Sequence, residues 1–205
     1  SFDKVICQSN DRLIDLKTNF GYENNLVLIN NPIDTEFIHK KVKGIKKIKS
    51  EKIRFVAIGR LSYQKGFDIL INAAKHLNIS NYELNILGDG ELKDNLQEQI
   101  VKNKLTKKVF LRGFQDNPYK WLLNSDALIL SSRFEGFSNV VLESLALQTP
   151  VIALPAKGGV QEVLSNVQGC MISPLMNAES LAATIEEWKN SNQKINQDSI
   201  KKYSI

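Results

Sequence analysis

The sequence predicts an α/β domain built on a doubly wound, Rossmann-like parallel sheet. Short runs rich in Val, Ile and Leu recur along the chain, and segments of helical length or turns separate them. Strands buried on both faces read as continuous apolar runs, and parallel strands need crossover connections. The predicted strands are Arg54–Ile58, Glu83–Leu87, Val109–Leu111, Ala127–Leu130, Val151–Leu154 and Cys170–Ile172.

Helices are predicted where apolar residues recur at helical spacing between these strands. One stripe consists of Phe67, Leu70, Ile71, Ala74 and Leu77, and a second of Leu92, Leu96 and Ile100. Further helices are predicted at Val140–Leu147, where Gln-Thr-Pro follows, in a short segment after Gly158 and Gly159, and at Glu179–Trp188. These helices should cover the sheet.

The chain before residue 53 has a different character. A strand at Val5–Cys7, a helix around Asp11–Thr18 and a strand at Leu26–Ile29 precede the turn Asn-Asn-Pro. This piece is either the first part of the same domain or the end of a preceding one. We therefore divide the chain into an end of an amino-terminal domain or interdomain segment (1–38), a lysine-rich linker (39–52), the Rossmann-like domain (53–190) and a tail (191–205).

Composition favours a soluble, cytoplasmic protein. With 42% apolar residues among 205, the chain can bury one substantial core. No apolar run approaches the roughly 20 residues that cross a bilayer, and the first residues lack the zones of a signal peptide. Cys7 and Cys170 stand far apart, which argues against a disulfide framework and a zinc site. We expect no metal and no cofactor.

Positive charge is concentrated in the linker. Residues 39–52 hold seven lysines and one glutamate, a charge of +6, which leaves the rest of the chain near −1 of the total +5. Such a run is usually a solvated loop. The alternative is a patch for an anionic membrane surface, at the inner face of the membrane, or for a lipid-phosphate acceptor. Nucleic acid is not expected as a partner, because neither interleaved aromatics nor a recognition helix is evident.

Ligands of open parallel sheets bind outside the carboxyl ends of the strands, so the loops there carry the candidate site. Arg60 and Lys65 follow the first strand in a loop bounded by Gly59 and Gly66. A diphosphate would pair with two cations at such a mouth; the alternative is that both side chains point into water. Asp89 in the next loop is expected to cap the following helix.

The stretch after the fourth strand contains two glutamates with different surroundings. Glu135 is predicted in the strand-to-helix loop, and Glu143 about one turn into the helix that begins near Ser138 or Asn139. Amides at that helix start favour a phosphate. A carboxylate within the helix can accept from two vicinal hydroxyls, as a ribose offers. An ordinary solvated residue is the alternative for Glu143, but its apolar neighbours make an unpartnered charge costly.

Taken together, these motifs resemble the donor-binding, carboxyl-terminal half of a family 4 (group 1) retaining glycosyltransferase of the GT-B type. The resemblance covers roughly Val5 to Trp188. Its strongest marks are "GRLSYQKGFDIL" and "EGFSNVVLE"; "GDGEL", "RGF" and "ALQTPVIA" followed by "GGVQEVL" stand in the family's order. The chain departs from the family where Asn31 replaces glycine, and where Glu91 and Gln161 replace prolines.

The resemblance implies roles for individual residues. Arg60 and Lys65 correspond to the cations that contact the donor diphosphate and stabilise the departing nucleotide, with Gly59 beside them. Glu135 corresponds to the glutamate at the donor sugar, and Glu143 to the ribose-binding carboxylate. The backbone of the segment that starts the helix would touch sugar and phosphate, and the loop after the third strand would line the base. These backbone positions are Phe137, Ser138, Asn139 and Val140, and Gly113 and Phe114.

The implied function is transfer of a hexosyl group from a nucleotide-diphosphate sugar, with UDP-sugar expected, onto a glycan or lipid-linked acceptor with retention. The acceptor would bind an amino-terminal domain absent from this chain, so these residues alone should be inactive. Two alternatives keep the architecture: a nucleotide-sugar epimerase and a non-catalytic nucleotide-sugar-binding module. A dehydrogenase fits least, because no Gly-x-Gly-x-x-Gly turn follows the first strand.

Overall fold

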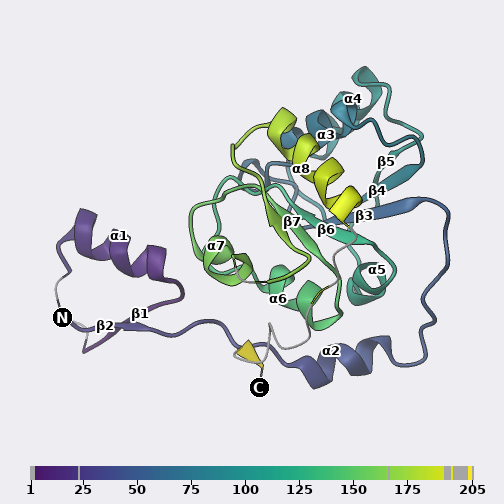
Figure 1. Cartoon of the computed structure of the whole chain (residues 1–205). Coiled ribbons are helices and arrows are strands. Elements are labelled where there is room, and N and C mark those ends of the chain that lie inside the picture. Colours follow the sequence, from purple (N-terminus) through teal and green to yellow (C-terminus); the bar gives the residue numbers. More distant parts are fainter. Residues whose placement is uncertain (1–2, 23, 166, 192–194, 196–202, 205) are drawn as a thin grey trace.

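A six-stranded parallel sheet with helices on both faces forms the centre of the computed structural model, which confirms the predicted fold class (Figure 1). The structure describes residues 3–22, 24–165, 167–191, 195 and 203–204. The strands lie within two residues of the predicted runs: β3 (Ile53–Ile58), β4 (Tyr82–Leu87), β5 (Val109–Leu111), β6 (Ala127–Leu130), β7 (Val151–Ala153) and β8 (Met171–Ile172).

The strand order β5-β4-β3-β6-β7-β8 is that of dinucleotide-binding sheets. The chain moves outward from β3 to β5, then returns to place β6 on the other side of β3. The connections after β3 and β6 therefore leave the sheet in opposite directions. A crevice forms between such loops, and ligands of this architecture bind there.

Helices cover the two faces because successive strand residues point to opposite sides. Phe55 and Ala57 of β3 face one core, and Val56 faces the other. The first face carries α3 (Phe67–His76), α4 (Lys93–Lys102) and α8 (Ala178–Ser191). The second carries α2 (Thr35–Val42), α5 (Tyr119–Leu123), α6 (Asn139–Ala146) and α7 (Gly159–Leu164) (Figure 1).

Two of these helices, α2 and α5, were not predicted. Each buries one side chain, Ile38 in α2 and Leu122 in α5, so neither sequence shows an apolar stripe. Helix α2 is capped by Asp34, whose carboxylate accepts from Phe37 N at 2.8 Å. It occupies the first residues of the segment that we set apart as a linker. The rest of that segment, residues 43–52, is neither helix nor strand.

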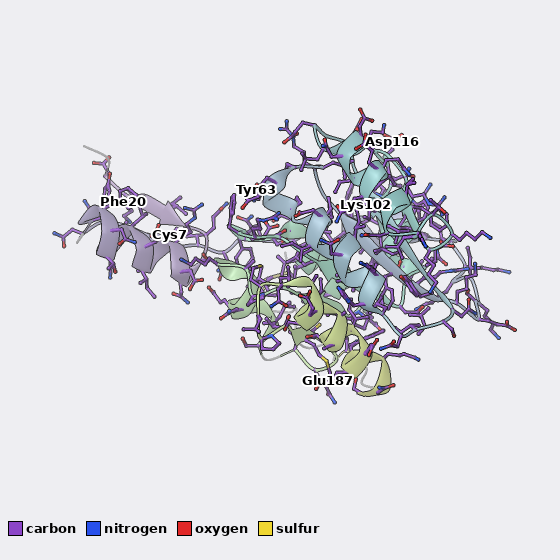
Figure 2. All side chains as sticks on the ribbon, turned by 90° about the horizontal axis from the view of Figure 1, so that it is seen from above. Cys7, Phe20, Tyr63, Lys102, Asp116 and Glu187 are labelled. Atoms are coloured by element: carbon purple, nitrogen blue, oxygen red, sulfur yellow. The ribbon has the colours of Figure 1, made fainter. Side chains whose placement is uncertain are left out.

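The amino-terminal piece forms a small unit of its own. The predicted strand, helix and strand are present as β1 (Val5–Cys7), α1 (Asn10–Phe20) and β2 (Leu26–Leu28), and the two strands pair in parallel. Figure 2 shows this unit, with Cys7 and Phe20, projecting from one side of the domain. It leaves large apolar side chains exposed: Ile6, Ile14, Phe20, Tyr22 and Ile29.

The predicted tail lies mostly outside the described residues. Ser191 is the last residue of α8. Tyr203 is buried, and its ring meets the Phe137 ring at a centroid distance of 5.5 Å. The end of the chain thus packs on the loop that precedes α6.

Candidate functional site

Glycines allow the loops at the carboxyl edge of the sheet to pass one another with their backbones in contact. A Cβ atom on Gly66 would lie 2.1 Å from Ser131 O, and one on Gly158 would lie 1.7 Å from Glu135 O. Both residues have positive φ, 61° and 117°. Only glycine fits such positions without displacing the neighbouring loop. The loops after β3, β6 and β7 are therefore locked together, with the β6 loop in the middle.

Lys65 and Glu135 meet across the crevice between β3 and β6. Lys65 Nζ donates to Glu135 Oε1 at 2.6 Å, and Ser132 Oγ donates to the same oxygen at 2.6 Å. The Lys65 side chain is 20% exposed and the Glu135 side chain 7%. The stem of Lys65 packs over Gly59, where a Cβ atom would lie 3.1 Å from it. A largely buried ion pair thus lies at the point where the strand order of the sheet reverses.

Arg60 lies apart from this pair. Its Nε donates to Glu91 Oε2 at 3.2 Å, and the two side chains are 75% and 55% exposed. Glu91 stands where the resembling family has proline, so this departure supplies a partner for Arg60. The predicted cap by Asp89 is wrong: α4 follows Leu92, without a side-chain cap. Asp89 instead accepts from Gly90 N within its own turn, because it lies four residues before the helix begins.

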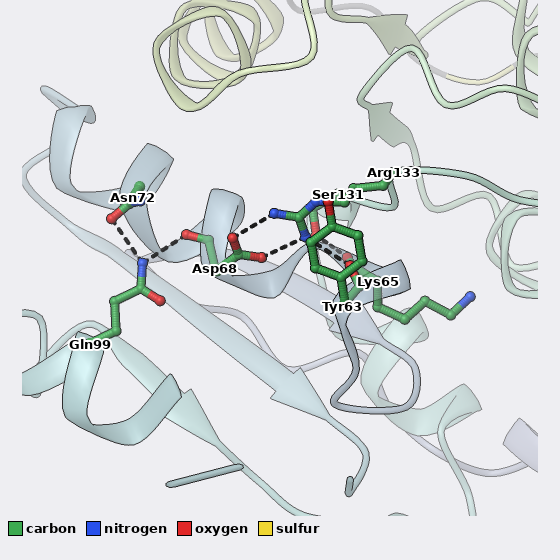
Figure 3. A network of polar contacts seen from close by, with 7 residues as sticks. All are labelled: Tyr63, Lys65, Asp68, Asn72, Gln99, Ser131 and Arg133. Carbon is green, nitrogen blue, oxygen red and sulfur yellow. Dashed lines mark hydrogen bonds and ion pairs between the residues drawn. The ribbon is translucent and has the colours of Figure 1, made fainter. Parts of the chain in front are cut away.

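Arg133 is a structural residue of the site that sequence reasoning missed (Figure 3). Its guanidinium donates to both oxygens of Asp68, at 2.8 and 2.7 Å, and to Tyr63 O at 2.7 Å, and it stacks on the Tyr63 ring. Burial alone would raise the pKa of Asp68, but the hydrogen bonds and charge of Arg133 lower it. Figure 3 shows the Lys65 amine pointing away from this network.

The Arg133 network fixes the loop that carries Lys65. Ser131 Oγ donates to Lys65 O at 2.8 Å, and Arg133 N donates to Gln64 O at 2.8 Å. The loop after β6 therefore donates hydrogen bonds to the loop after β3 through both its backbone and its side chains. The available signal was the position of Arg133 three residues after the end of a buried strand and two residues before Glu135.

Glu143 lies in α6, one turn after its start, as predicted. It is half-buried; burial raises its pKa, against the lowering effect of a hydrogen bond from Tyr119. With Asn139 it lines a pocket of about 170 Å³ between α6, α5 and α2. Ser138, which precedes the helix, makes no side-chain capping bond. Asn31 Nδ2, from the residue that replaces the family's glycine, donates to Asn139 Oδ1 at 2.9 Å.

The remaining predicted positions differ in accessibility. Gly113 has a φ of 69°, and an added methyl group there would have nothing within 4 Å of it, while Phe114 is 75% exposed. The Phe137 side chain is buried in the second core, and Val140 packs against that core. For Phe137, only the backbone can therefore meet a ligand, whereas Val140 is partly buried. None of these four residues lines the pocket beside Glu143.

A larger cleft of about 520 Å³ separates α1 from the loops after β6 and β7. Glu135 and Lys157 line one wall, and Asp11 and Asp15 line the other. Asp11 Oδ2 accepts from Gly158 N at 2.9 Å, in front of α7. In return, Glu162 Oε2 of α7 accepts from Asn10 N at 3.0 Å, at the start of α1.

Each of the helices α1 and α7 therefore places a carboxylate at the amino terminus of the other, where the helix dipole favours negative charge. Glu162 also accepts from Asn30 Nδ2 at 3.2 Å. These contacts join the amino-terminal unit to the glycine loop that braces Glu135. They link residues about 150 positions apart, as with Asn10 and Glu162, so no local pattern could have revealed them.

Metal-binding clusters and membrane-spanning helices are both missing from the part of the chain that the structure describes. Among those residues, no group of three or more His, Cys, Asp or Glu side chains is placed to hold a metal ion. None of the helices described has the length and apolar character that a bilayer crossing requires.

Comparison with known proteins places these features in context. The family "Glycosyl transferases group 1" matches residues 39–204. An uncharacterized glycosyltransferase of Methanocaldococcus jannaschii is 42% identical over 134 residues, which are 64% of this chain and 32% of that protein. A second relative is the N-acetylgalactosamine-N,N'-diacetylbacillosaminyl-diphospho-undecaprenol 4-alpha-N-acetylgalactosaminyltransferase of Campylobacter jejuni. It is 34% identical over 180 residues, 87% of this chain and 48% of its own length.

A solved structure shares the fold. The Anabaena protein HepE, in complex with UDP and glucose, superposes with a TM-score of 0.79 and 22% identity over 92% of this chain and 54% of its own. The chain thus spans between about a third and a half of the length of the two curated relatives.

Proposed function

Because the chain belongs to the group 1 glycosyl transferases, we propose that it binds the nucleotide-diphosphate sugar from which such an enzyme transfers a hexosyl group. The resemblance seen in the motifs is confirmed by the family match. The observation that supports the proposal most strongly is the largely buried Lys65–Glu135 ion pair at the switch point between β3 and β6. A cation for phosphate and a carboxylate for sugar hydroxyls stand side by side there.

The proposed reaction breaks the bond between the anomeric carbon and the β-phosphate oxygen. The acceptor oxygen attacks the same face of the sugar, so configuration is retained, and its proton passes to the departing phosphate. Charge builds on that phosphate in the transition state, where fixed cations stabilise it most. Lys65, joined by Arg60, would supply this stabilisation, and we expect no metal to be needed.

Donor binding would rearrange the ion pairs now present. Lys65 is neutralised by Glu135, and Arg60 by Glu91. The Arg60 pair is exposed, so it costs little to exchange for a phosphate. Lys65 needs a partner of comparable charge before it leaves Glu135, and a diphosphate provides one. Glu135 is then free to accept from sugar hydroxyls, while Glu143 accepts from the ribose.

UDP is the favoured nucleotide, and a glycan or lipid-linked sugar the favoured acceptor. The solved HepE complex contains UDP and glucose, and the Campylobacter relative is named for a diphospho-undecaprenol-linked acceptor. The exposed apolar residues of the β1–α1–β2 unit suit a surface that packs on further structure. We propose that an amino-terminal domain binds the acceptor there, and that this chain alone binds the donor without turnover.

A thermal-shift panel of UDP, GDP, ADP and their sugars tests the proposal on this chain. UDP-sugars should raise the unfolding temperature most, since a ligand at a hundred times its Kd adds about 2.7 kcal/mol to the free energy of unfolding. An unchanged unfolding temperature with all three nucleotide classes would contradict the proposed function. Release of a free epimer from the donor without acceptor would identify an epimerase instead.

Replacing Glu143 with glutamine should separate stability from binding. Burial raises the Glu143 pKa above its ordinary 4.5, so the folded state prefers the neutral acid. The ionised form therefore destabilises the fold as pH rises through that raised pKa, and has no effect below the ordinary value. Glu143→Gln should unfold at higher temperature than wild type at neutral pH, with no difference in acid.

The same variant should bind UDP more weakly. Loss of charged hydrogen bonds to the ribose, worth about 1.5–3 kcal/mol, predicts roughly a tenfold to hundredfold increase in Kd by calorimetry. Glu162→Gln serves as the comparison, because Glu162 accepts hydrogen bonds outside the proposed donor site. Equal UDP affinity of Glu143→Gln and wild type would remove Glu143 from the site.

A further inference from the structure

The lysine-rich segment, together with α2, forms a surface with an excess of positive charge, because seven lysines stand against Glu36 and Glu51. Within the described residues, none of its lysines takes part in an ion pair. Lys41 lies over the Phe37 ring at 5.1 Å. Every lysine of the segment is exposed: Lys40, Lys41, Lys43, Lys46, Lys47, Lys49 and Lys52.

Apolar side chains are exposed among these lysines. Ile48 is 60% exposed, Phe37 46% and Ile45 37%. The segment around Ile48 is nevertheless fixed to the domain, because Ile48 N donates to Asn124 Oδ1 at 2.7 Å and Arg54 donates to Ile48 O at 3.3 Å. Ile48 is thus held at the surface by its backbone, with its side chain directed outward rather than into the core.

A groove of about 460 Å³ adjoins the segment and is also lined by both apolar and positively charged side chains. Ile45, Ile48 and Trp121 supply apolar surface, and Arg54, Arg112 and Lys120 supply positive charge. Glu83 is the one acidic residue among those that line it, and it pairs with Arg112 at 3.6 Å. Cations beside apolar walls suit an anionic amphiphile better than a free anion.

We propose that the surface formed by α2, residues 43–52 and the adjoining groove docks the chain on an anionic lipid bilayer. Lysines near such a surface contribute additively, and isoleucine side chains can enter the headgroup region. Nucleic acid suits the surface less, because isoleucines rather than free aromatic rings alternate with the lysines. The segment leads into the amino end of β3, whereas the donor loops follow the carboxyl ends of the strands. Docking through residues 43–52 leaves the loops that carry Lys65 and Glu135 at the opposite end of the sheet, whereas Phe37 of α2 lines the pocket beside Glu143.

Sedimentation with vesicles tests this proposal independently of nucleotide binding. The chain should bind vesicles of phosphatidylcholine mixed with phosphatidylglycerol, and not phosphatidylcholine alone, with binding that weakens as salt rises. Combined Lys46→Gln, Lys47→Gln and Lys49→Gln should weaken binding roughly a hundredfold. Combined Lys75→Gln, Lys102→Gln and Lys107→Gln changes the net charge equally on exposed lysines elsewhere and should leave binding within a few-fold of wild type.

Two further arms decide whether a bilayer is the partner. Ile48→Ser removes an exposed side chain without touching the backbone bonds and should weaken vesicle binding roughly threefold to tenfold. Inorganic phosphate should not compete at the concentration of lipid headgroups. Equal loss in both triple variants, no loss with Ile48→Ser, competition by phosphate, or preference for an RNA duplex over vesicles would each overturn the proposal.

Discussion

Replacing Lys65 with methionine is expected to destabilise the chain by about 3 kcal/mol and to remove most of the affinity for UDP-sugar that we propose. The variant leaves the Glu135 carboxylate buried without its cation, and breaking a buried ion pair from one side costs about 3–5 kcal/mol. The lower end applies because the Lys65 side chain is 20% exposed and Ser132 still donates to Glu135. Denaturant unfolding measures the loss of stability, and calorimetry the loss of affinity.

The double variant Lys65→Met, Glu135→Gln separates the two effects. It contains no buried charge at this position, so most of the stability should return. Affinity for the diphosphate should not return, since no cation replaces Lys65. Wild-type stability of Lys65→Met alone would mean that the pair contributes nothing to the fold. Wild-type affinity of the double variant would mean that Lys65 does not bind phosphate.

The sequence predicted the sheet well because its strands are buried on both faces. Runs such as Ala127–Leu130 and Val151–Ala153 are apolar throughout, and parallel strands with that character leave few alternatives. Helices α2 and α5 escaped prediction for the opposite reason: most of their residues remain exposed or half-buried, so their apolar pattern is weak. Short helices of this kind form through tertiary packing rather than through their own sequence.

The candidate site was predicted residue by residue, but not as a set of contacts. The sequence placed Lys65 and Glu135 in separate roles, whereas the structure joins them at 2.6 Å. Arg133 and Asp68 were missed because a bidentate pair between a loop and the first turn of α3 has no sequence signature. The contact of Asp11 with Gly158 depends on how the amino-terminal unit sits against the domain. Such long-range pairings follow from topology, which local patterns do not encode.

Two departures from the family pattern form hydrogen bonds in the structure. Asn31, in place of glycine, bonds Asn139 at the start of α6, and Glu91, in place of proline, bonds Arg60. Both side chains touch residues that the resemblance assigns to the donor. Two of the three departures, Asn31 and Glu91, therefore contact residues of the proposed donor site.

Gly66→Ala should be among the most destabilising single substitutions in the domain, by roughly 3–5 kcal/mol, since strain at a special backbone position is a mechanism that produces such values. The added methyl would lie 2.1 Å from Ser131 O, an atom of the backbone that cannot rotate away. Relief requires the loops after β3 and β6 to separate. That movement would also pull Lys65 from Glu135, because Gly66 directly follows Lys65.

Gly113→Ala provides the matched control for this substitution. Gly113 has nearly the same φ, 69° against 61°, but nothing lies within 4 Å of an added methyl. It should therefore show only the cost of the left-handed conformation, about 1–2 kcal/mol. Denaturant unfolding of the two variants separates backbone strain from loop contact. Equal destabilisation would show that the close approach of Gly66 to Ser131 adds nothing, and that the two loops can part without cost. A larger loss at Gly66 would show that the loop contact which positions Lys65 is itself part of what holds the domain together.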